Sequence, residues 1–471
     1  MIADLGPYAE YKDSGVPWLG DVPAHWDIRR IKTVLREATS RTPDGQGTLL
    51  ALTRSRGLIP RSDSTARVAS ASTLVGYKHY KPTQIVMNRM QAWSGMFGLA
   101  AISGLVSPDY AVFDVVQPQS PSFMLLRIKT PDLVGQFAIA SRGIGSGFNR
   151  LYTDKLGAVW LALPPPDEQA AIVRFLDWAT RRVDRAIRAK RRLVALLTEQ
   201  KQAIIHRAVT QGLDPSVPMK ASGIPWLGEI PAHWEVRRIG AFARVGNGST
   251  PARSNPSYWR GGHYPWLNSS QVHRGVIGSA DQFVTTRALA ECHLPRLSYG
   301  AVLIAITGQG KTRGTAAILA MDATINQHIA YIIPSGSIVS SAYLQSYLQA
   351  SYVALRAMSE DAGSTKGAIT CRDLKSFGIA VPPMSQQAAI VAHLDDATAG
   401  INSTIERTQR QIGLLREYRA RLVADVVTGK LDVRAFAETL PDEAPDDIEA
   451  VEADVDEDAD DDETGDGADE G

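Results

Sequence analysis

The sequence has little cysteine and no long apolar run. Cys292 and Cys371 are the only two cysteines among 471 residues. Without further cysteines or clustered histidines they predict neither a disulfide framework nor a zinc site. The first residues lack the basic start and apolar core of a signal peptide, and no apolar run approaches the ~18 residues of a membrane span. We therefore expect a soluble protein of the reducing cytoplasm, without a membrane partner.

The sequence also lacks net charge, with 50 basic and 50 acidic residues, but the two signs are unevenly distributed. Residues 438–471 contain 18 acidic and no basic residues, so residues 1–437 carry 50 basic and 32 acidic side chains, a net +18. A body this basic is typical of proteins that bind polyanions. The tail has almost no large apolar residues and is predicted to be disordered. It either adds solubility or competes with a polyanion for the basic body.

The chain contains an internal repeat. SGVPWLGDVPAHWDIRRI from Ser14 and SGIPWLGEIPAHWEVRRI from Ser222 are identical at 13 of 18 positions. A second pair, PPPDEQAAIVRFLDWAT from Pro164 and PPMSQQAAIVAHLDDAT from Pro382, continues without a gap to VTQGLD and VTGKLD. Each half therefore has a short Trp-rich element, a variable block and a repeated helix.

The repeated helices have a coiled-coil period. Apolar residues recur at alternating spacings of four and three, namely Val183, Ile187, Val194, Leu197, Ile204 and Ala208 in the first copy and Ile401, Ile405, Ile412, Leu415, Leu422 and Val426 in the second. Lys190, Lys201, Thr408 and Arg419 fall at other positions of this stripe. Helices of about 40 to 45 residues would be roughly 60 to 65 Å long, and such stripes need a partner. The other copy, as an antiparallel coiled coil with a pseudo-two-fold axis, is the favoured partner; the helix's own domain or a separate subunit are alternatives.

The Trp-rich elements are nearly the same in both halves, so they cannot read two different ligands. Trp18, His25 and Trp26 match Trp226, His233 and Trp234. They either pack each domain against the helices, which we favour, or dock two equivalent partner subunits.

The variable blocks, about 32–162 and 240–380, do not align with each other convincingly. Strand-like runs such as VLIAITG from Val302 alternate with helical spacing such as AYLQSYLQASYVALRAMS from Ala342, which predicts an α+β protein with two α/β domains. The first block has 15 basic and seven acidic residues and the second 12 and six. A constant frame around divergent basic blocks favours different contacts in the two halves over simple drift.

Two short motifs resemble catalytic loops but are incomplete. A phosphate-binding loop ending in the GKT at Gly310 requires glycine where the chain has Ala305. NPSY from Asn255 has Ser257 in place of the second proline of a methyltransferase loop, and no cofactor-binding glycine loop accompanies it. We found no triad, metal cluster or nuclease carboxylate pair, so we expect no catalysis by this chain.

Taken together, these motifs resemble the specificity subunit of type I restriction-modification systems, over nearly the whole chain to about residue 432. The resemblance is carried by GNGSTPARSNPSYWRGGHYPWLNSSQV from Gly246, GSTKGAIT from Gly363, MNRMQAW and GLVSPDY. It divides the chain into a first frame element and target-recognition domain (1–162), a central helix (163–214), a second frame element and recognition domain (215–380), a C-terminal helix (381–432) and the tail (438–471).

The resemblance implies a non-catalytic reader of double-stranded DNA. Each recognition domain would read one half of a bipartite site, and the two helices would set the gap between the halves. The chain would scaffold two adenine-N6 methyltransferase subunits and two restriction subunits. S-adenosylmethionine, ATP and Mg would be bound by those partners, with no cofactor or metal in this chain. The alternative is a coiled-coil scaffold with only non-specific affinity for nucleic acid.

Candidate DNA contacts are basic and amide side chains within the matched motifs, because guanidinium and amide groups pair with base edges and cations with phosphates. In the first block they are Arg54, Arg56, Lys78, Arg89, Gln91 and Arg142. In the second they are Arg253, Tyr258, Arg260, Asn268, Gln271, Lys311, Arg313, Gln327 and Lys366.

Overall fold

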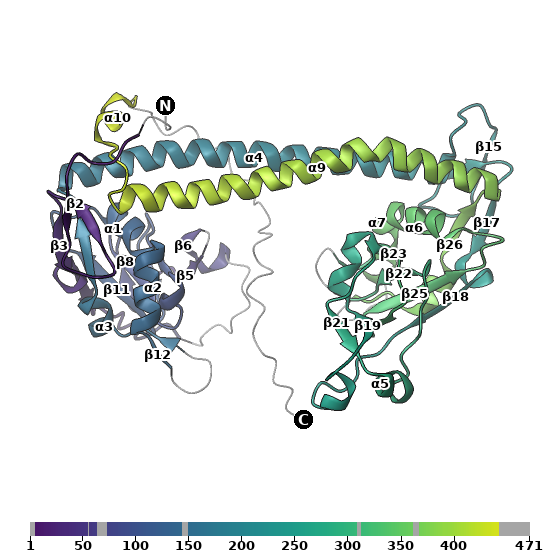
Figure 1. Ribbon diagram of the computed structural model, residues 1–471, viewed down its shortest axis with the longest axis horizontal. Helices are drawn as coiled ribbons and strands as arrows, with labels where there is room; N and C mark the ends of the chain where they lie inside the picture. The colour runs from purple at the N-terminus through teal and green to yellow at the C-terminus, as the bar shows by residue number, and fades with distance from the viewer. Residues whose placement is uncertain are drawn as a thin grey trace. The chain divides into compact units, whose positions relative to one another are not determined.

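The computed structural model describes residues 5–54, 56–63, 73–143, 149–308, 312–360 and 367–441 (Figure 1). The chain forms two compact units, unit 1 from residues 1–186 and 414–471 and unit 2 from residues 187–413. Two long helices, α4 (Pro166–Gln211) and α9 (Met384–Val427), each contribute to both units. In the described part of the chain, no helix combines the length and apolar character needed to cross a bilayer.

Unit 1 is built around an antiparallel sheet with the strand order β4-β11-β8-β9. Its strands are β1 (Tyr11–Asp13), β2 (Asp21–Pro23), β3 (Asp27–Arg30), β4 (Leu35–Ala38), β5 (Leu50–Thr53), β6 (Gly57–Pro60), β7 (Lys78–Tyr80), β8 (Ile85–Asn88), β9 (Phe97–Gly98), β10 (Gly104–Val106), β11 (Tyr110–Val115), β12 (Arg142–Gly143), β13 (Asn149–Arg150) and β14 (Trp160–Leu163). Its shorter α-helices are α1 (Pro121–Ile128), α2 (Pro131–Ala140), α3 (Thr153–Ala158) and α10 (Arg434–Thr439).

Unit 2 is built around a sheet with the order β18-β25-β22-β23-β20 and a smaller one with the order β21-β19-β24. Its strands are β15 (Met219–Ala221), β16 (Glu229–Pro231), β17 (Glu235–Arg238), β18 (Ala243–Asn247), β19 (Tyr264–Leu267), β20 (Val276–Ile277), β21 (Gln282–Val284), β22 (Val302–Ala305), β23 (Ala316–Leu319), β24 (Thr324–Ile325), β25 (Ile329–Pro334) and β26 (Gly378–Val381). Its shorter α-helices are α5 (Thr286–Glu291), α6 (Ser341–Ala350), α7 (Tyr352–Glu360) and α8 (Cys371–Ser376).

The two variable blocks share a sheet core that their sequences do not reveal. In each unit a first strand (β4 or β18) pairs antiparallel with a central one (β11 or β25), which pairs antiparallel with a third (β8 or β22). A two-stranded pair, β3–β14 or β17–β26, then leads into the long helix. The mixed α and β content predicted for both blocks is confirmed, and the blocks differ in the elements added to this core, such as the β21-β19-β24 sheet and the parallel β20–β23 pair of unit 2.

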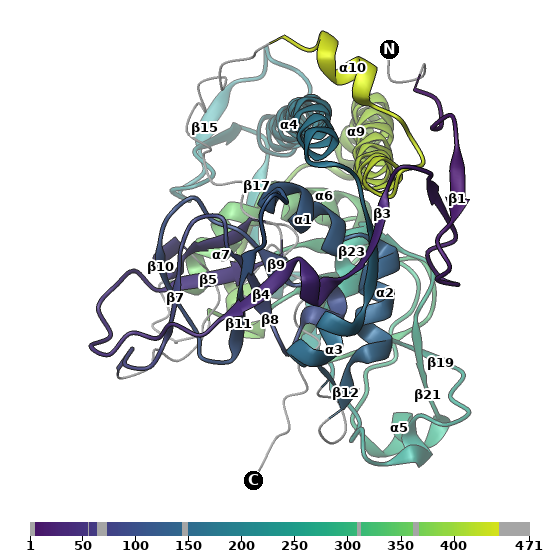
Figure 2. The same cartoon turned by 90° about the vertical axis from the view of Figure 1, so that its left-hand side faces the viewer.

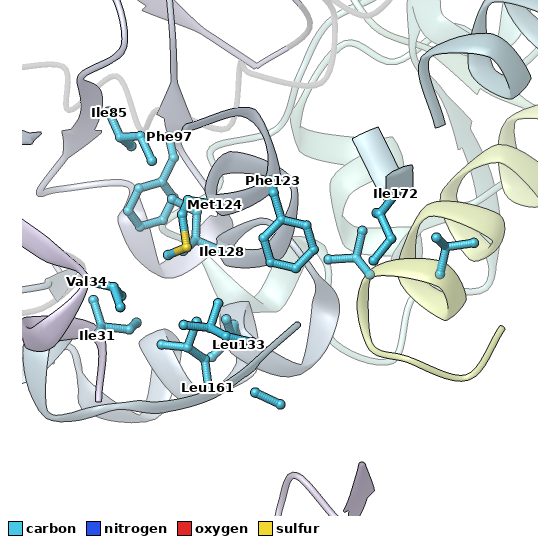
Figure 3. Close-up of a cluster of buried hydrophobic side chains, with 14 of the residues drawn as sticks. Ile31, Val34, Ile85, Phe97, Phe123, Met124, Ile128, Leu133, Leu161 and Ile172 are labelled. Atoms are coloured by element: carbon cyan, nitrogen blue, oxygen red, sulfur yellow. The ribbon is translucent and has the colours of Figure 1, made fainter. Parts of the chain in front are cut away.

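Apolar side chains from the sheet, its helices and the start of α4 fill the core of unit 1. Figure 3 shows Phe123 and Ile128 of α1, Leu133 of α2 and Ile172 of α4 within one cluster, each fully buried. The local sequence determines the start of α1 at Pro121, because Ser120 accepts a hydrogen bond from the amide of Phe123 and proline is favoured in the first turn.

A buried glutamine at the start of each long helix joins the helix to its own unit. Gln169 Oε1 accepts a hydrogen bond from the amide of Ser120 (2.9 Å), and Gln387 Oε1 accepts one from the amide of Ser340 (2.8 Å). Both side chains are fully buried. Each long helix is therefore anchored through its first turns to the domain that precedes it.

Within each unit, α4 and α9 also contact each other in antiparallel register. In unit 1, Arg419 donates to Asp184 (2.6 Å). In unit 2, Lys190 donates to Gln411 and Lys201 to Asn402, both at 2.7 Å. The predicted stripe residues Val183, Ile187, Ile412 and Leu422 are less than 9% exposed.

The Trp-rich elements pack against the body of each unit. Trp26 is 0% and Trp234 1% exposed. The partly buried Trp226 stacks on Phe377, with ring centroids 5.3 Å apart and an interplanar angle of 16°. These contacts supply the packing role that we favoured from the sequence.

The segment after α9 folds back onto unit 1. Phe436 of α10 lies edge-on to Phe175 of α4 at 5.5 Å, and Arg174 donates to the carbonyl of Leu440 at 2.5 Å. Figure 2 shows α10 near α4 and β1 beside α9 in this unit. The predicted disordered tail therefore begins too early, because α10 extends to Thr439 and Leu440 is 7% exposed. Residues 442–471 lie outside the described residues.

Replacing Trp226 with alanine should destabilise unit 2 by about 2–4 kcal/mol, because an aromatic stack and part of the core are lost. Urea unfolding followed by far-UV circular dichroism measures the change. Trp93→Ala, at a tryptophan that is 40% exposed, is the control and should shift stability much less. Unchanged stability in Trp226→Ala would contradict the packing role.

Candidate nucleic-acid interface

In unit 2 several loops meet at one end of the sheets. β18 ends opposite the start of β25, with Asn247 facing Ala330, and β22 ends there too, with Ala305 facing Ile329. β19 runs parallel to β24, and the amide of Asn326 donates to the carbonyl of Leu267 at 2.9 Å. The loops after β18, β19, β22 and β24 therefore converge.

These loops carry hydrogen-bonding side chains, and we call the group Thr250, Asn268, Thr307, Gln327 and His328 the β22 edge. Thr250 donates to Gln327 Oε1 at 2.5 Å, Thr307 Oγ1 lies 2.8 Å from His328 Nδ1, and the Gln327 and His328 Nε2 atoms are 3.3 Å apart. Gln327 and His328 are exposed. The β22 edge thus presents amide, hydroxyl and imidazole groups that are already held in place.

Unit 1 has an equivalent edge at the corresponding end of its sheet. β8 ends opposite the start of β11, with Asn88 facing Tyr110, and β4 ends at the same side. We call Arg54, Arg89, Gln91 and Trp93 the β8 edge. They lie in the loop after β8 and in the turn of the β5–β6 hairpin.

Contacts within the β8 edge orient its side chains. Arg54 donates to the backbone carbonyl and hydroxyl oxygens of Ser94, both at 3.2 Å, which joins the hairpin turn to the loop. Gln91 Oε1 accepts from Asn88 at 2.8 Å. Arg89 pairs with Glu37 at 2.6 Å and is only partly exposed. Arg54 and Gln91 are the exposed polar groups of this edge.

Three of the residues predicted to contact DNA are instead buried and hydrogen-bonded within the fold, which contradicts that prediction. Lys78 is 3% exposed and donates to the carbonyl of Tyr110 at 2.6 Å. Gln271, 2% exposed, donates to Asp281, and Arg313, 4% exposed, donates to the carbonyl of Gly367. Burial, and secondarily Arg89, lowers the pKa of the Lys78 ammonium. The type of a residue does not indicate whether its side chain will be buried against an acceptor within the fold.

The other candidates of unit 2 lie on the smaller sheet and its flanking elements. The guanidinium of Arg253 stacks 3.9 Å from the ring centroid of Trp259 and 5.0 Å from that of Trp266. The hydroxyl of Tyr258 donates to Glu291 at 3.0 Å, which raises the pKa of Tyr258. Arg260, next to Trp259 in the chain, is exposed.

The remaining candidates are only partly described. Arg56 is exposed in the turn of the β5–β6 hairpin and donates to the carbonyl of Asp63 at 2.8 Å. The backbone of Arg142 pairs with Arg150 in the β12–β13 ladder. Lys311 and Lys366 lie outside the described residues.

Sequence reasoning missed Thr250, Thr307 and His328. The strand-like runs VLIAITG and IAYIIP already predicted where β22 ends and β25 begins. The polar residues at the end of the first run and just before the second, Thr307 and His328, could have been selected from that signal alone. Among the described residues, no group of three or more His, Cys, Asp or Glu side chains is arranged to hold a metal ion.

The chain is similar in sequence to one family of proteins. The family model described as "Type I restriction modification DNA specificity domain" matches residues 231–413. The EcoR124I/EcoR124II type I restriction enzyme specificity subunit of Escherichia coli is 25% identical over 181 residues, 38% of this chain and 45% of that relative. The MjaIX specificity subunit of Methanocaldococcus jannaschii is 22% identical over 293 residues, 61% of this chain and 64% of that relative. The matches thus span less than two thirds of these relatives.

The fold is also shared with a solved structure. A chain described under "Structural basis underlying complex assembly and conformational transition of the type I R-M system" superposes with a TM-score of 0.60 at 18% identity, covering 87% of this chain and 99% of that one. At this identity the likeness concerns the fold alone. The sequence matches make the chain similar to the type I restriction-modification specificity subunits, and residues 231–413 match the DNA specificity domain of that family.

Replacing Lys78 with methionine should destabilise unit 1 by about 1–3 kcal/mol, because the carbonyl of Tyr110 loses its buried donor. Urea unfolding measures the effect, and DNA affinity should stay unchanged under conditions where the variant is folded. Arg54→Met, at an exposed cation, is the matched control and should change stability by less than about 0.5 kcal/mol. A Lys78→Met chain of full stability and reduced DNA affinity would restore Lys78 to the interface.

Proposed function

We propose that the chain reads a split DNA sequence, one half with each unit. The observation that carries this proposal is that both units build a polar loop edge on the same strand order, β4-β11-β8 and β18-β25-β22, but with different side chains. A shared frame with unequal reading groups would select two different half-sites.

The groups at each edge suit base recognition. Amide side chains such as Gln91 and Gln327 can pair with two atoms of adenine in the major groove, and a guanidinium such as that of Arg54 can pair with two atoms of guanine. Gln91, Gln327 and Arg54 are all exposed. Other exposed cations, including Arg56 and Arg260, would bind phosphates and give the affinity a strong dependence on salt.

The long helices would set the gap between the half-sites. The antiparallel contacts of α4 with α9 in unit 1, at Asp184 and Arg419, and in unit 2, at Lys190 and Gln411, support an antiparallel coiled coil with a pseudo-two-fold axis. A stiff helix pair of this kind can hold two readers at a defined spacing on DNA.

The chemistry would belong to partner subunits. The relatives are specificity subunits of type I restriction enzymes, so we propose two methyltransferase subunits, which use S-adenosylmethionine to methylate adenine N6, and two restriction subunits, which use ATP and Mg. This chain would bind no cofactor, would not be catalytic, and would position those partners on the site.

Replacing Gln327 with alanine should relax one position in one half of the methylated sequence. The loss of a two-point contact with a base costs about 1–3 kcal/mol, or roughly 5- to 150-fold in discrimination. Mapping of methylated adenines in cells that express the chain with its methyltransferase measures it. Gln200→Ala, at an exposed glutamine of α4, is the control and should leave the motif unchanged.

The outcome separates a specific reader from a non-specific scaffold. In Gln91→Ala cells, the half-site that Gln327→Ala relaxes should stay intact, and the other half-site should relax. If neither glutamine variant altered the mapped motif, and affinity for random DNA equalled that for the motif, a coiled-coil scaffold would replace the reader.

A further inference from the structure

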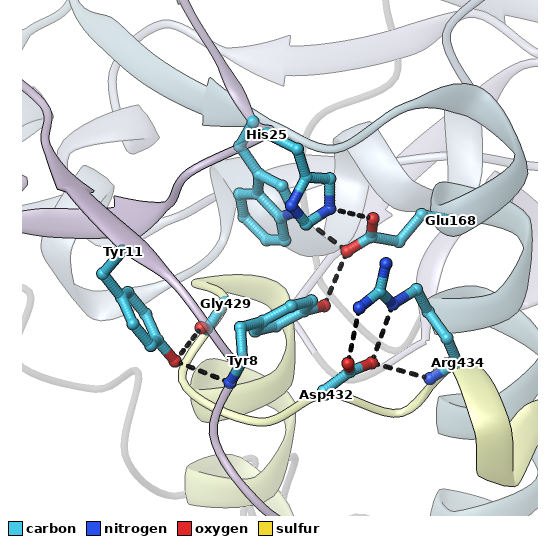
Figure 4. A network of polar contacts seen from close by, with 8 residues as sticks. Tyr8, Tyr11, His25, Glu168, Gly429, Asp432 and Arg434 are labelled. Carbon is cyan, nitrogen blue, oxygen red and sulfur yellow. Dashed lines mark hydrogen bonds and ion pairs between the residues drawn. The ribbon is translucent and has the colours of Figure 1, made fainter.

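In unit 1, Tyr8 fills a space over the buried Trp26. Tyr8 is 4% exposed, and its ring centroid lies 6.0 Å from that of Trp26 and 5.7 Å from that of His25. Its hydroxyl donates to Glu168 at 2.6 Å (Figure 4). Glu168 also accepts from the Trp26 indole at 2.9 Å. A phenol thus completes the contact between the Trp-rich element and the first turn of α4.

Unit 2 has the same walls around an open cavity. Gln386, in the position of Glu168, accepts from the Trp234 indole at 2.8 Å and lies 3.0 Å from His233 Nε2. These three residues line a cavity of about 140 Å³ together with Pro231, Ala389 and Ile390. We call this cavity the unit 2 socket. Cavities of about 150 Å³ accommodate a benzene ring.

The socket is open because the repeat places a serine where unit 1 has Tyr8. β1 pairs with β2 through Tyr11 and Pro23, and β15 pairs with β16 through Met219 and Pro231, so the register is the same. The next contact also matches, since Ala24 donates to the carbonyl of Glu10 and Ala232 to that of Pro218.

Counting two residues further back gives Tyr8 in one copy and Ser216 in the other. The side chain of Ser216 is exposed and donates to Asp214 at 2.6 Å. A hydroxymethyl group cannot replace a phenol ring, so the volume that Tyr8 fills in unit 1 is left free in unit 2.

No tyrosine of this chain lies in the socket. Residues 212–218, which connect α4 to β15, include no aromatic residue. All 14 tyrosines of the chain fall within the described ranges and none of them lines the socket, and residues 442–471 contain no tyrosine, phenylalanine or tryptophan. An occupant equivalent to Tyr8 must therefore come from another molecule.

We propose that the unit 2 socket binds a tyrosine side chain presented by a partner protein. The walls that hold Tyr8 in unit 1 define the ring's place against Trp234. Gln386 replaces a carboxylate, which only accepts, by an amide, which also donates and can pair with the phenol oxygen. Ala389 and His233 are exposed at the rim, so a partner segment can reach the socket. The proposal is independent of DNA recognition.

Ligand-observed NMR with the full-length chain and N-acetyl-L-tyrosinamide tests the socket itself. Saturable binding is expected, with a dissociation constant on the order of 1 mM for so small a ligand. Ser216→Tyr should fill the socket from within and weaken binding at least tenfold, and Ala389→Leu should block it to the same degree. Ala388→Leu, next to it on the exposed helix surface but not lining the cavity, is the matched control and should bind as the wild type does.

The reciprocal variant opens the equivalent space in unit 1. Tyr8→Ser should roughly double the number of N-acetyl-L-tyrosinamide molecules bound. The proposal is overturned if the wild-type chain shows no saturable binding, or if Ser216→Tyr and Ala389→Leu both bind as strongly as Ala388→Leu does.

A second experiment identifies the protein that supplies the tyrosine. Only this experiment rests on the proposed function. Assembly with the methyltransferase subunit should be at least tenfold weaker for Ser216→Tyr and Ala389→Leu than for Ala388→Leu. Probe binding with unchanged assembly would show that the partner tyrosine is the wrong occupant. If the wild-type chain fails to bind the methyltransferase at all, the proposed function fails while the probe result still stands.

Discussion

Both units depend on one contact, between the indole of a buried tryptophan and the first turn of a long helix. Trp26 donates to Glu168 and Trp234 to Gln386, and both tryptophans are almost fully buried. Because the next residue in each helix is the buried glutamine that binds the start of α1 or α6, this turn joins the Trp-rich element, the variable block and the helix at one point. The orientation of each loop edge relative to its own helix follows from that junction.

A constant junction leaves the loop edges free to differ. The strands that carry the edges are apolar and buried, as in β22, where all four residues are buried, so they place few limits on the residues that follow them. The β8 edge then presents guanidinium, amide and indole groups, and the β22 edge amide, hydroxyl and imidazole groups. The loops can thus be exchanged without loss of the core that holds them.

The long helices were predictable because a proline stop and a sustained apolar stripe act locally, and α4 and α9 begin close to Pro164 and Pro382. The shared sheet core was not predictable, since IVMN in β8 and VLIA in β22 need only be apolar and extended, and many sequences satisfy that. For the candidate interface, selection by residue type picked Gln91 and Gln327, which lie on exposed loops. It also picked Lys78, whose ammonium is held in the interior by the carbonyl of Tyr110. Such long-range partners depend on the fold and leave no local signal.

The central claim is that each unit reads its own half-site, and exchange of the blocks tests it most directly. A chain with residues 32–162 in both frames, in place of residues 240–380, would be expressed with the methyltransferase, and its methylated adenines would be mapped beside those of the wild type. We expect a split site whose two halves are the same sequence, the half that unit 1 reads in the wild type. A site that retains the wild-type second half would contradict it.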